Sequence, residues 1–115
     1  MPRPMTDELP VDLARQTGQA LLTRGWRLIS AESCTGGLLA ATVTEIAGSS
    51  DWFEGAYVTY RLTAKMAMVG VDEELLVNHG AVSEPVARAM AEGALSHSDA
   101  DIAVAITGVA GPGGG

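Results

Sequence analysis

Strand-like and helix-like segments alternate along this chain, and that alternation limits the folds available to it. Runs rich in apolar, β-branched or aromatic residues occupy positions 26–31, 56–60 and 102–106. The stretches around them carry apolar residues at three- and four-residue intervals and end at glycines, as amphipathic helices do. Such alternation predicts an α/β fold: a three-layer α/β/α sandwich with a parallel or mixed sheet.

The helical stretches can be bounded from their periodicity and capping residues. The first should carry its apolar stripe on residues 13–21 and stop near Gly25, which leaves residues 1–9 as a polar N-terminal tail and residues 10–115 as one domain. Ser83 fits the N-cap of a later helix, with Pro85 in its first turn. Further helices are expected near 38–46, 63–69 and 72–78, and the strand at 102–106 is expected to be covered on both faces.

Composition excludes several functional classes. The 115 residues, 47% of them hydrophobic, suit one packed domain, and a net charge of −7 is the wrong sign for binding a phosphate backbone, so no nucleic-acid partner is expected. A single cysteine and two distant histidines provide neither a disulfide nor a metal site. No stretch approaches the ~20 apolar residues of a membrane span, so we expect a cytoplasmic protein without membrane contact.

Three loops follow predicted strands, and ligands of such sheets collect at the carboxyl ends of the strands. They are the turn that starts at Ser33, the segment from Tyr60 to Lys65, and the glycine-rich stretch 107–115. If the strands are parallel neighbours, all three loops meet on one rim.

A Ser33–Lys65 pair could form on that rim. A lysine activates a serine if burial lowers its pKa from ~10.4 towards ~7–8, and the small or apolar neighbours of Lys65 could bury it. Spacing alone also fits a solvated lysine, and Ser33 or Thr35 could simply cap the following helix. Cys34 could be the nucleophile or a buried apolar side chain.

Other polar residues receive plainer interpretations. The acids Glu32, Asp51 and Glu54 are candidates for carboxylates that support the catalytic residues, but no spacing singles them out and the default expectation is that they are solvated. His79 and His97 are expected to sit at helix ends, and Trp52 and Phe53 to fill the core. The closing glycines allow close backbone approach to a ligand, although glycine runs also form flexible linkers.

Five segments, in matching order, resemble the CinA C-terminal domain family over residues 10–115. They are AESCTGG at 31–37, AGSSDWF at 47–53, VTY at 58–60 with Ala64-Lys65, HGAVSE at 79–84, and TGVAGPGG at 107–114. The family, which includes competence/damage-inducible proteins, is known for nicotinamide-nucleotide amidohydrolases. These enzymes hydrolyse nicotinamide mononucleotide to nicotinate mononucleotide and ammonia in pyridine-nucleotide salvage.

The resemblance implies a role for each matching residue. Ser33 corresponds to the nucleophile, Lys65 to the general base, and Tyr60 to a further member of the catalytic set. Backbone N–H groups near Thr35 and Gly36 would hold the oxyanion. Thr107 would line the pocket, and the glycine loop would help to seat the nucleotide through Gly108, Gly111 and Gly113. No metal and no cofactor is implied, and the partner is a small nucleotide.

The chain departs from the family pattern at two places. Arg61 and Leu62 replace the Ser-Asn that usually follows the tyrosine, and family members continue past the glycine loop with further strands and a helix. A sheet without those strands would expose an edge, which makes a homo-oligomer an expectation. The alternative to the hydrolase is a catalytically degenerate nucleotide-binding or interaction domain.

Overall fold

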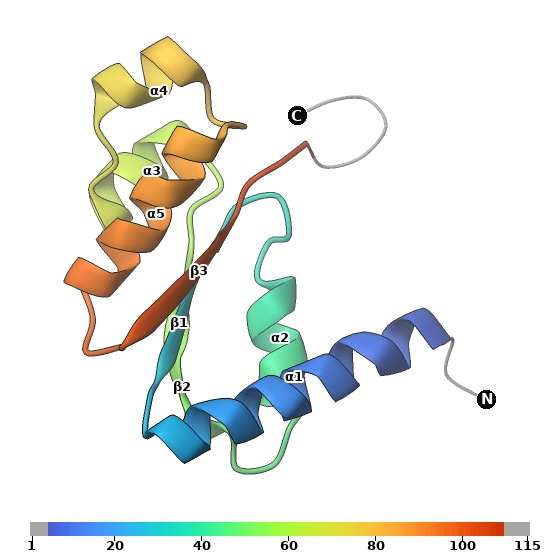
Figure 1. The fold of residues 1–115 in the computed structure, drawn as a ribbon. Helices are drawn as coiled ribbons and strands as arrows, with labels where there is room; N and C mark the ends of the chain where they lie inside the picture. Colours follow the sequence, from blue (N-terminus) through green and yellow to red (C-terminus); the bar gives the residue numbers. More distant parts are fainter. Residues whose placement is uncertain (1–4, 110–115) are drawn as a thin grey trace.

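The computed structural model describes residues 5–109 and has the α/β architecture that the sequence predicts (Figure 1). The glycines at 111 and 113, assigned above to substrate binding, lie outside the described residues. In chain order the elements are α1 Met5–Arg24, β1 Leu28–Glu32, α2 Leu38–Thr44, a 3₁₀ turn Ser49–Asp51, β2 Phe53–Val58, α3 Leu62–Val69, α4 Glu73–His79, α5 Glu84–Ser96 and β3 Ile102–Ile106.

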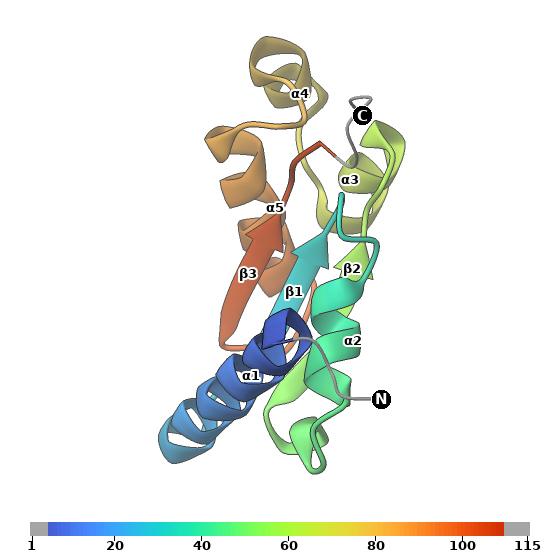
Figure 2. The same cartoon turned by 90° about the vertical axis from the view of Figure 1, so that its right-hand side faces the viewer.

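The three strands form a parallel sheet in the order β2-β1-β3. Helices α1 and α2 cover one face and α3, α4 and α5 lie on the other, so the three-layer prediction is confirmed (Figures 1 and 2). All residues of the central strand β1 are buried. The strand at 102–106 was expected to be covered on both faces, and β3 does pack on both layers, with Ala103 and Ala105 against one core cluster and Val104 against the other. The cover is incomplete, because Ile102 is exposed and the other residues are half-buried.

Side chains of β1 alternate between the two layers, as the pleat of a strand requires. Ile29 and Ala31 belong to the core cluster built with α3, α4 and α5. Leu28 belongs to the second cluster, with Val43 of α2 and Trp52. Residues at odd positions of β1 therefore face one helical layer and residues at even positions face the other.

Helix α1 is longer than its sequence pattern indicates. It begins at Met5, so residues 5–9 are helical rather than part of a tail. Pro10 lies inside the helix, where it removes one backbone hydrogen bond but has a φ angle that a helix accepts. Acidic residues near the start of a helix complement its dipole, which favours the earlier beginning.

Most of the capping predictions are confirmed. The Ser83 side chain accepts a hydrogen bond from the Val86 N–H at the start of α5. His79 is the last residue of α4, and Nδ1 of His97, at the end of α5, lies 2.8 Å from the Gly93 carbonyl oxygen. Trp52 is buried as expected, and its ring packs against Gly18 of α1.

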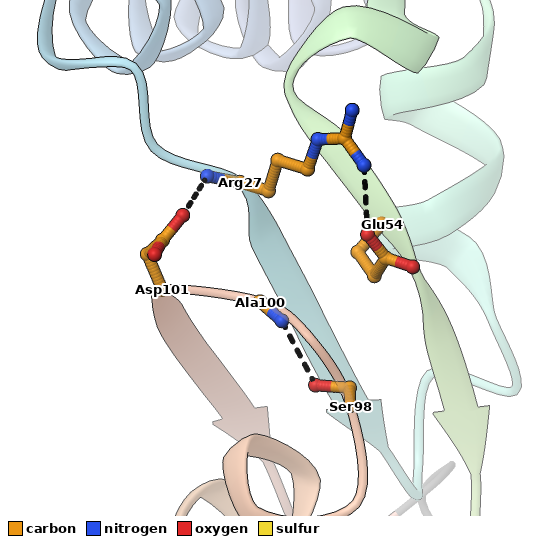
Figure 3. Close-up of polar contacts among 5 residues, drawn as sticks. All are labelled: Arg27, Glu54, Ser98, Ala100 and Asp101. Carbon is orange, nitrogen blue, oxygen red and sulfur yellow. Dashed lines mark hydrogen bonds and ion pairs between the residues drawn. The ribbon is translucent and has the colours of Figure 1, made fainter.

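Polar contacts tie the strands together where they begin (Figure 3). The Arg27 N–H donates to Oδ2 of Asp101 at 2.8 Å, and its carbonyl accepts from the Asp101 N–H at 2.8 Å. The Arg27 guanidinium reaches Glu54 of β2 at 3.4 Å, and the Ala100 N–H donates to Ser98 Oγ at 3.3 Å. The bonds of Arg27 link the start of β1 to the segments that begin β2 and β3, and the Ser98 bond closes the turn before β3. At the other end of the sheet Glu32 pairs with Val58 and Ile106, so the three carboxyl ends finish at the same rim.

Candidate active site

Ser33 follows the central strand directly and continues its alternation towards the layer that contains α3. Its N–H donates to the Ile106 carbonyl of β3 at 3.0 Å, and its own carbonyl accepts from the Gly36 N–H at 3.1 Å. The side chain is 6% exposed. The hydroxyl is thus fixed by backbone bonds on both sides of the residue.

Lys65, in the first half of α3, points its amine at that hydroxyl. Nζ lies 2.9 Å from Ser33 Oγ, 2.7 Å from the Thr59 carbonyl oxygen and 3.3 Å from the Tyr60 carbonyl oxygen. The side chain is 1% exposed, so the solvated alternative for Lys65 is wrong. Burial lowers the pKa of the amine from its ordinary 10.5, and the neighbouring Cys34 thiol opposes part of this decrease.

The two carbonyls that hold Lys65 are available because β2 ends earlier than predicted. The sequence pattern favours a strand over 56–60, but β2 covers Phe53–Val58. Thr59 still donates its N–H to the Glu32 carbonyl at 2.8 Å, and the chain then leaves the sheet. Its carbonyl and that of Tyr60 turn to the lysine instead of to a neighbouring strand.

A pocket of about 190 Å³ opens beside the serine and the lysine. Side chains or backbone from all three predicted loops line it, together with the segment that precedes α5. The lining residues are Ser33, Cys34, Tyr60, Lys65, Ala81, Val82, Thr107, Gly108 and Val109. Its volume is below the ~300–1,000 Å³ of pockets that enclose a drug-sized ligand, so it suits the reacting end of a substrate.

The β3 side of the pocket is held by Thr107 and Gly108. Oγ1 of Thr107 donates to the Ala81 carbonyl at 2.7 Å, which joins the end of β3 to the loop before α5. A Cβ atom on Gly108 would lie 3.2 Å from Cys34 Sγ, so the Cys34 side chain lies close to the backbone of Gly108. Tyr60 borders the opening and is 63% exposed.

Thr35 and Gly36 are not among the residues that line this pocket. The Thr35 hydroxyl donates to Glu32 Oε1 at 2.8 Å on the α2 side of the sheet, and the Gly36 N–H is already bonded to Ser33. The geometry does not bring either residue to the expected oxyanion position. Cys34 does line the pocket, and its N–H has no hydrogen-bond partner within residues 5–109.

Glu32 is the residue that sequence reasoning placed wrongly. It was expected to be solvated, but it is completely buried. The signal was present in the strand pattern, because an even position of the central strand points towards α2. Asp51 and Glu54, by contrast, are exposed as expected.

A second, larger hollow lies between α1, α2 and β3. It has a volume of about 460 Å³ and is lined mainly by apolar side chains, with Leu13, Leu38 and Trp52 among them. No serine, cysteine or titratable group lines it. The smaller pocket is therefore the candidate for chemistry.

The described part of the chain contains neither a cluster of metal-binding side chains nor a helix that could span a membrane. Within residues 5–109, no three His, Cys, Asp or Glu side chains gather in a way that could hold a metal ion. None of the helices described there is both long and apolar enough to cross a membrane.

Comparison with known proteins agrees with the geometry. The model of the CinA C-terminal domain matches residues 11–115. The chain belongs to the CinA C-terminal domain family. It is 57% identical over 111 residues to the protein named nicotinamide-nucleotide amidohydrolase PncC from Escherichia coli K12, an alignment that covers 96% of this chain and 67% of that protein. It is also 58% identical over 103 residues to a putative competence-damage inducible protein of Symbiobacterium thermophilum, covering 90% of this chain and 24% of that one.

Solved structures of the family have the same fold. The competence/damage inducible protein CihA from Agrobacterium tumefaciens superposes with a TM-score of 0.90 at 48% identity, covering all of this chain and 68% of the other. A CinA superfamily protein from Escherichia coli has a TM-score of 0.90 at 38% identity, covering all of this chain and 66% of the other. Arg61 and Leu62, the two departures from the family pattern noted in the sequence, are both exposed.

Proposed function

We propose that this protein hydrolyses the carboxamide of nicotinamide mononucleotide, with Ser33 as nucleophile and Lys65 as general base. The observation that carries the proposal is the buried contact of 2.9 Å between Lys65 Nζ and Ser33 Oγ. The relatives named nicotinamide-nucleotide amidohydrolases supply the substrate class. The products would be nicotinate mononucleotide, which can re-enter pyridine-nucleotide synthesis, and ammonia.

The partners of Lys65 match the needs of a neutral amine. A neutral –NH₂ group has two N–H donors and one lone pair. The carbonyls of Thr59 and Tyr60 can take both donors, which directs the lone pair at the Ser33 hydroxyl. Burial lowers the pKa of Lys65, so the neutral form is available at a lower pH than for a lysine in water.

The reaction then proceeds in two halves. Ser33 Oγ attacks the amide carbon while Lys65 Nζ takes its proton, and the Cys34 N–H can donate to the oxyanion that develops. Lys65 returns the proton to the amide nitrogen, which leaves as ammonia. The acyl group stays on Ser33 Oγ as an ester. Water, activated by Lys65 in turn, hydrolyses that ester to the carboxylate and free serine.

The proposal is tested by ammonia release from nicotinamide mononucleotide by the purified chain and its Ser33→Ala variant. We expect the variant to lose activity by a factor on the order of 10⁴, because the attacking atom is gone. Cys34→Ala is the matched control, because it changes the adjacent nucleophile and should retain turnover. A Ser33→Ala variant as active as the wild type would refute the serine mechanism.

Calorimetry with the same nucleotide distinguishes the hydrolase from a domain that binds the nucleotide without turning it over. Binding without ammonia release would favour a nucleotide-binding domain that has lost catalysis. Activity lost in Cys34→Ala but kept in Ser33→Ala would assign the attack to the thiol.

A further inference from the structure

The Glu32 carboxylate is buried next to the nucleophile without taking part in the chemistry described above. Its two oxygens accept four hydrogen bonds. Oε1 accepts from the Thr35 hydroxyl and the Leu39 N–H, each at 2.8 Å, and Oε2 accepts from the Ala40 N–H at 3.0 Å and the Ser30 hydroxyl at 3.2 Å. No arginine, lysine or histidine forms an ion pair with it within residues 5–109. Burying a carboxylate without a cation is costly, so a site that keeps one needs an explanation.

The carboxylate replaces a missing helix cap. The residue at the N-cap of α2 is Gly37, which has φ +103° and no side chain to accept from the first turn. An N-cap side chain ordinarily bonds the N–H of the second or third helical residue. Glu32 bonds both, since these are Leu39 and Ala40.

The same residue fixes the turn that carries Ser33. This turn, residues 33–37, contains two glycines in the left-handed region, Gly36 at φ +61° and Gly37 at φ +103°. Glycines lose much conformational freedom when they are fixed, so the turn needs anchors at both ends. The Glu32 carboxylate anchors the end of the turn that leads into α2, by accepting from the Leu39 N–H. It also anchors the middle of the turn, by accepting from the Thr35 hydroxyl.

Glu32 also belongs to a closed ring of contacts around the catalytic pair. Its carbonyl accepts from the Thr59 N–H at 2.8 Å, and the Thr59 carbonyl accepts from Lys65 Nζ at 2.7 Å. Nζ in turn contacts Ser33 Oγ, and Ser33 is covalently joined to Glu32. The Glu32 side chain therefore holds the turn of Ser33, whereas the link to Lys65 runs through the Glu32 backbone carbonyl, which a side-chain substitution leaves in place.

We propose that Glu32 is a positioning residue, whose buried carboxylate holds the turn 33–37 against α2 and thereby sets Ser33 Oγ within reach of Lys65 Nζ. This inference rests on the proposed function, because it concerns the same pair. Glu32 does not touch the substrate or exchange a proton with it.

Glu32→Gln is the decisive variant. The two side chains have the same shape, but each oxygen of Glu32 faces a backbone N–H. Whichever way the amide of glutamine is turned, its NH₂ group meets a donor, so one anchor is lost while the core volume is kept. A displacement of about 1 Å at a reacting group can reduce the rate about 100-fold.

The experiment measures the rate at which a fluorophosphonate probe labels Ser33, from pH 6 to 10, for each folded variant. Ser33 Oγ displaces fluoride from phosphorus, and Lys65 takes the hydroxyl proton. The plateau of the labelling rate at high pH reports how well Ser33 Oγ is positioned, and the pH at half of that plateau reports the pKa of Lys65. We expect Glu32→Gln to lower the plateau about 10-fold to 100-fold with an unchanged midpoint.

Val43→Ala is the matched control, because it removes two methyl groups from the core under α2 and leaves all four hydrogen bonds of the Glu32 carboxylate in place. It should label at the wild-type rate. Equal labelling of Glu32→Gln and wild type, a shifted midpoint in Glu32→Gln, or an equal loss in Val43→Ala would each overturn the positioning role. If Glu32→Gln does not fold, Thr35→Val decides: it removes one of the four bonds, and an unchanged plateau overturns the proposal.

A different result would bear on the function itself. If Ser33 of the wild-type chain does not react with the probe at any pH, the proposed function and the positioning role both fail. If wild type reacts and Glu32→Gln reacts equally, only the positioning role fails.

Discussion

Gly93 provides a sharp test of how α5 packs on α3. A Cβ atom at this position would lie 1.8 Å from the Val69 carbonyl oxygen and 2.8 Å from its carbonyl carbon, whereas ordinary contact begins at 3.4 Å. The obstacle is backbone at the end of α3, so no side chain can rotate away. In Gly93→Ala the two helices must therefore separate by roughly 1.6 Å, the shortfall from ordinary contact.

The size of the effect follows from two opposing terms. Overpacking of a core costs about 1–3 kcal/mol, and a rigid backbone obstacle puts this site at the upper end. Replacing glycine by alanine within a helix returns about 1 kcal/mol. We expect Gly93→Ala to reduce the free energy of unfolding by about 2 kcal/mol, which corresponds to about 10 °C in the melting temperature of a domain of this size.

The assay is urea unfolding followed by circular dichroism, with ammonia release measured below the transition. Gly108→Ala is the control: among residues 5–109 its Cβ would meet the movable Cys34 side chain alone, at 3.2 Å, so stability should change by less than about 0.5 kcal/mol. Lys65 lies one turn before Val69, so Gly93→Ala should also lower activity in the folded protein. A Gly93→Ala protein as stable as wild type would refute the close packing of α5 on α3.

Two other predictions concern the surroundings of the lysine. Thr59 Oγ1 is buried and has no hydrogen-bond partner among the described residues. Thr59→Val should therefore raise the free energy of unfolding, measured in urea titrations, by about 1 kcal/mol. A lower free energy of unfolding in the variant would show that the hydroxyl is hydrogen-bonded. Because the pKa of Lys65 is lower in the folded protein than in the unfolded chain, the unfolded chain binds more protons between the two values. The free energy of unfolding should therefore rise with pH through that window up to about 10.5, and wild-type activity should increase as the pH passes the lowered pKa of Lys65. Lys65→Met should abolish the rise in stability. A rise that persists in this variant would contradict its assignment to Lys65.

Local patterns predicted most of the architecture because they arise from local physics. Periodicity, the Ser83 cap and the glycines that end helices depend on neighbouring residues, and the corresponding elements lie close to their expected positions. The boundaries of β2 were shifted because strand-forming composition does not show where a neighbouring strand stops. β1 ends at Glu32, and beyond Thr59 the chain has no strand to pair with.

The site was predicted only in part. The rule for the carboxyl ends of parallel strands brought together Ser33, Tyr60, Lys65 and Thr107, which now line one pocket. The rule does not separate the two faces of the sheet. The oxyanion role that the family resemblance implied for Thr35 does not match its position, because Thr35 bonds Glu32 on the opposite side. Burial of Glu32 follows from its even position on β1 only once β1 is known to be the central strand, and composition does not show which strand is central.

The central place of β1 makes the appearance of the site a late event in folding. Ser33 and Lys65 are 32 residues apart, but the backbone of Ser33 is anchored to Ile106, and the start of β1 is tied to Asp101 across 74 residues. Contacts so distant in sequence form slowly. A nascent chain exposes Ser33 and Lys65 well before β3 is synthesised. The Ser33 backbone therefore lacks its partner Ile106 until β3 docks, and labelling of Ser33 by a serine-reactive probe would time that step during synthesis.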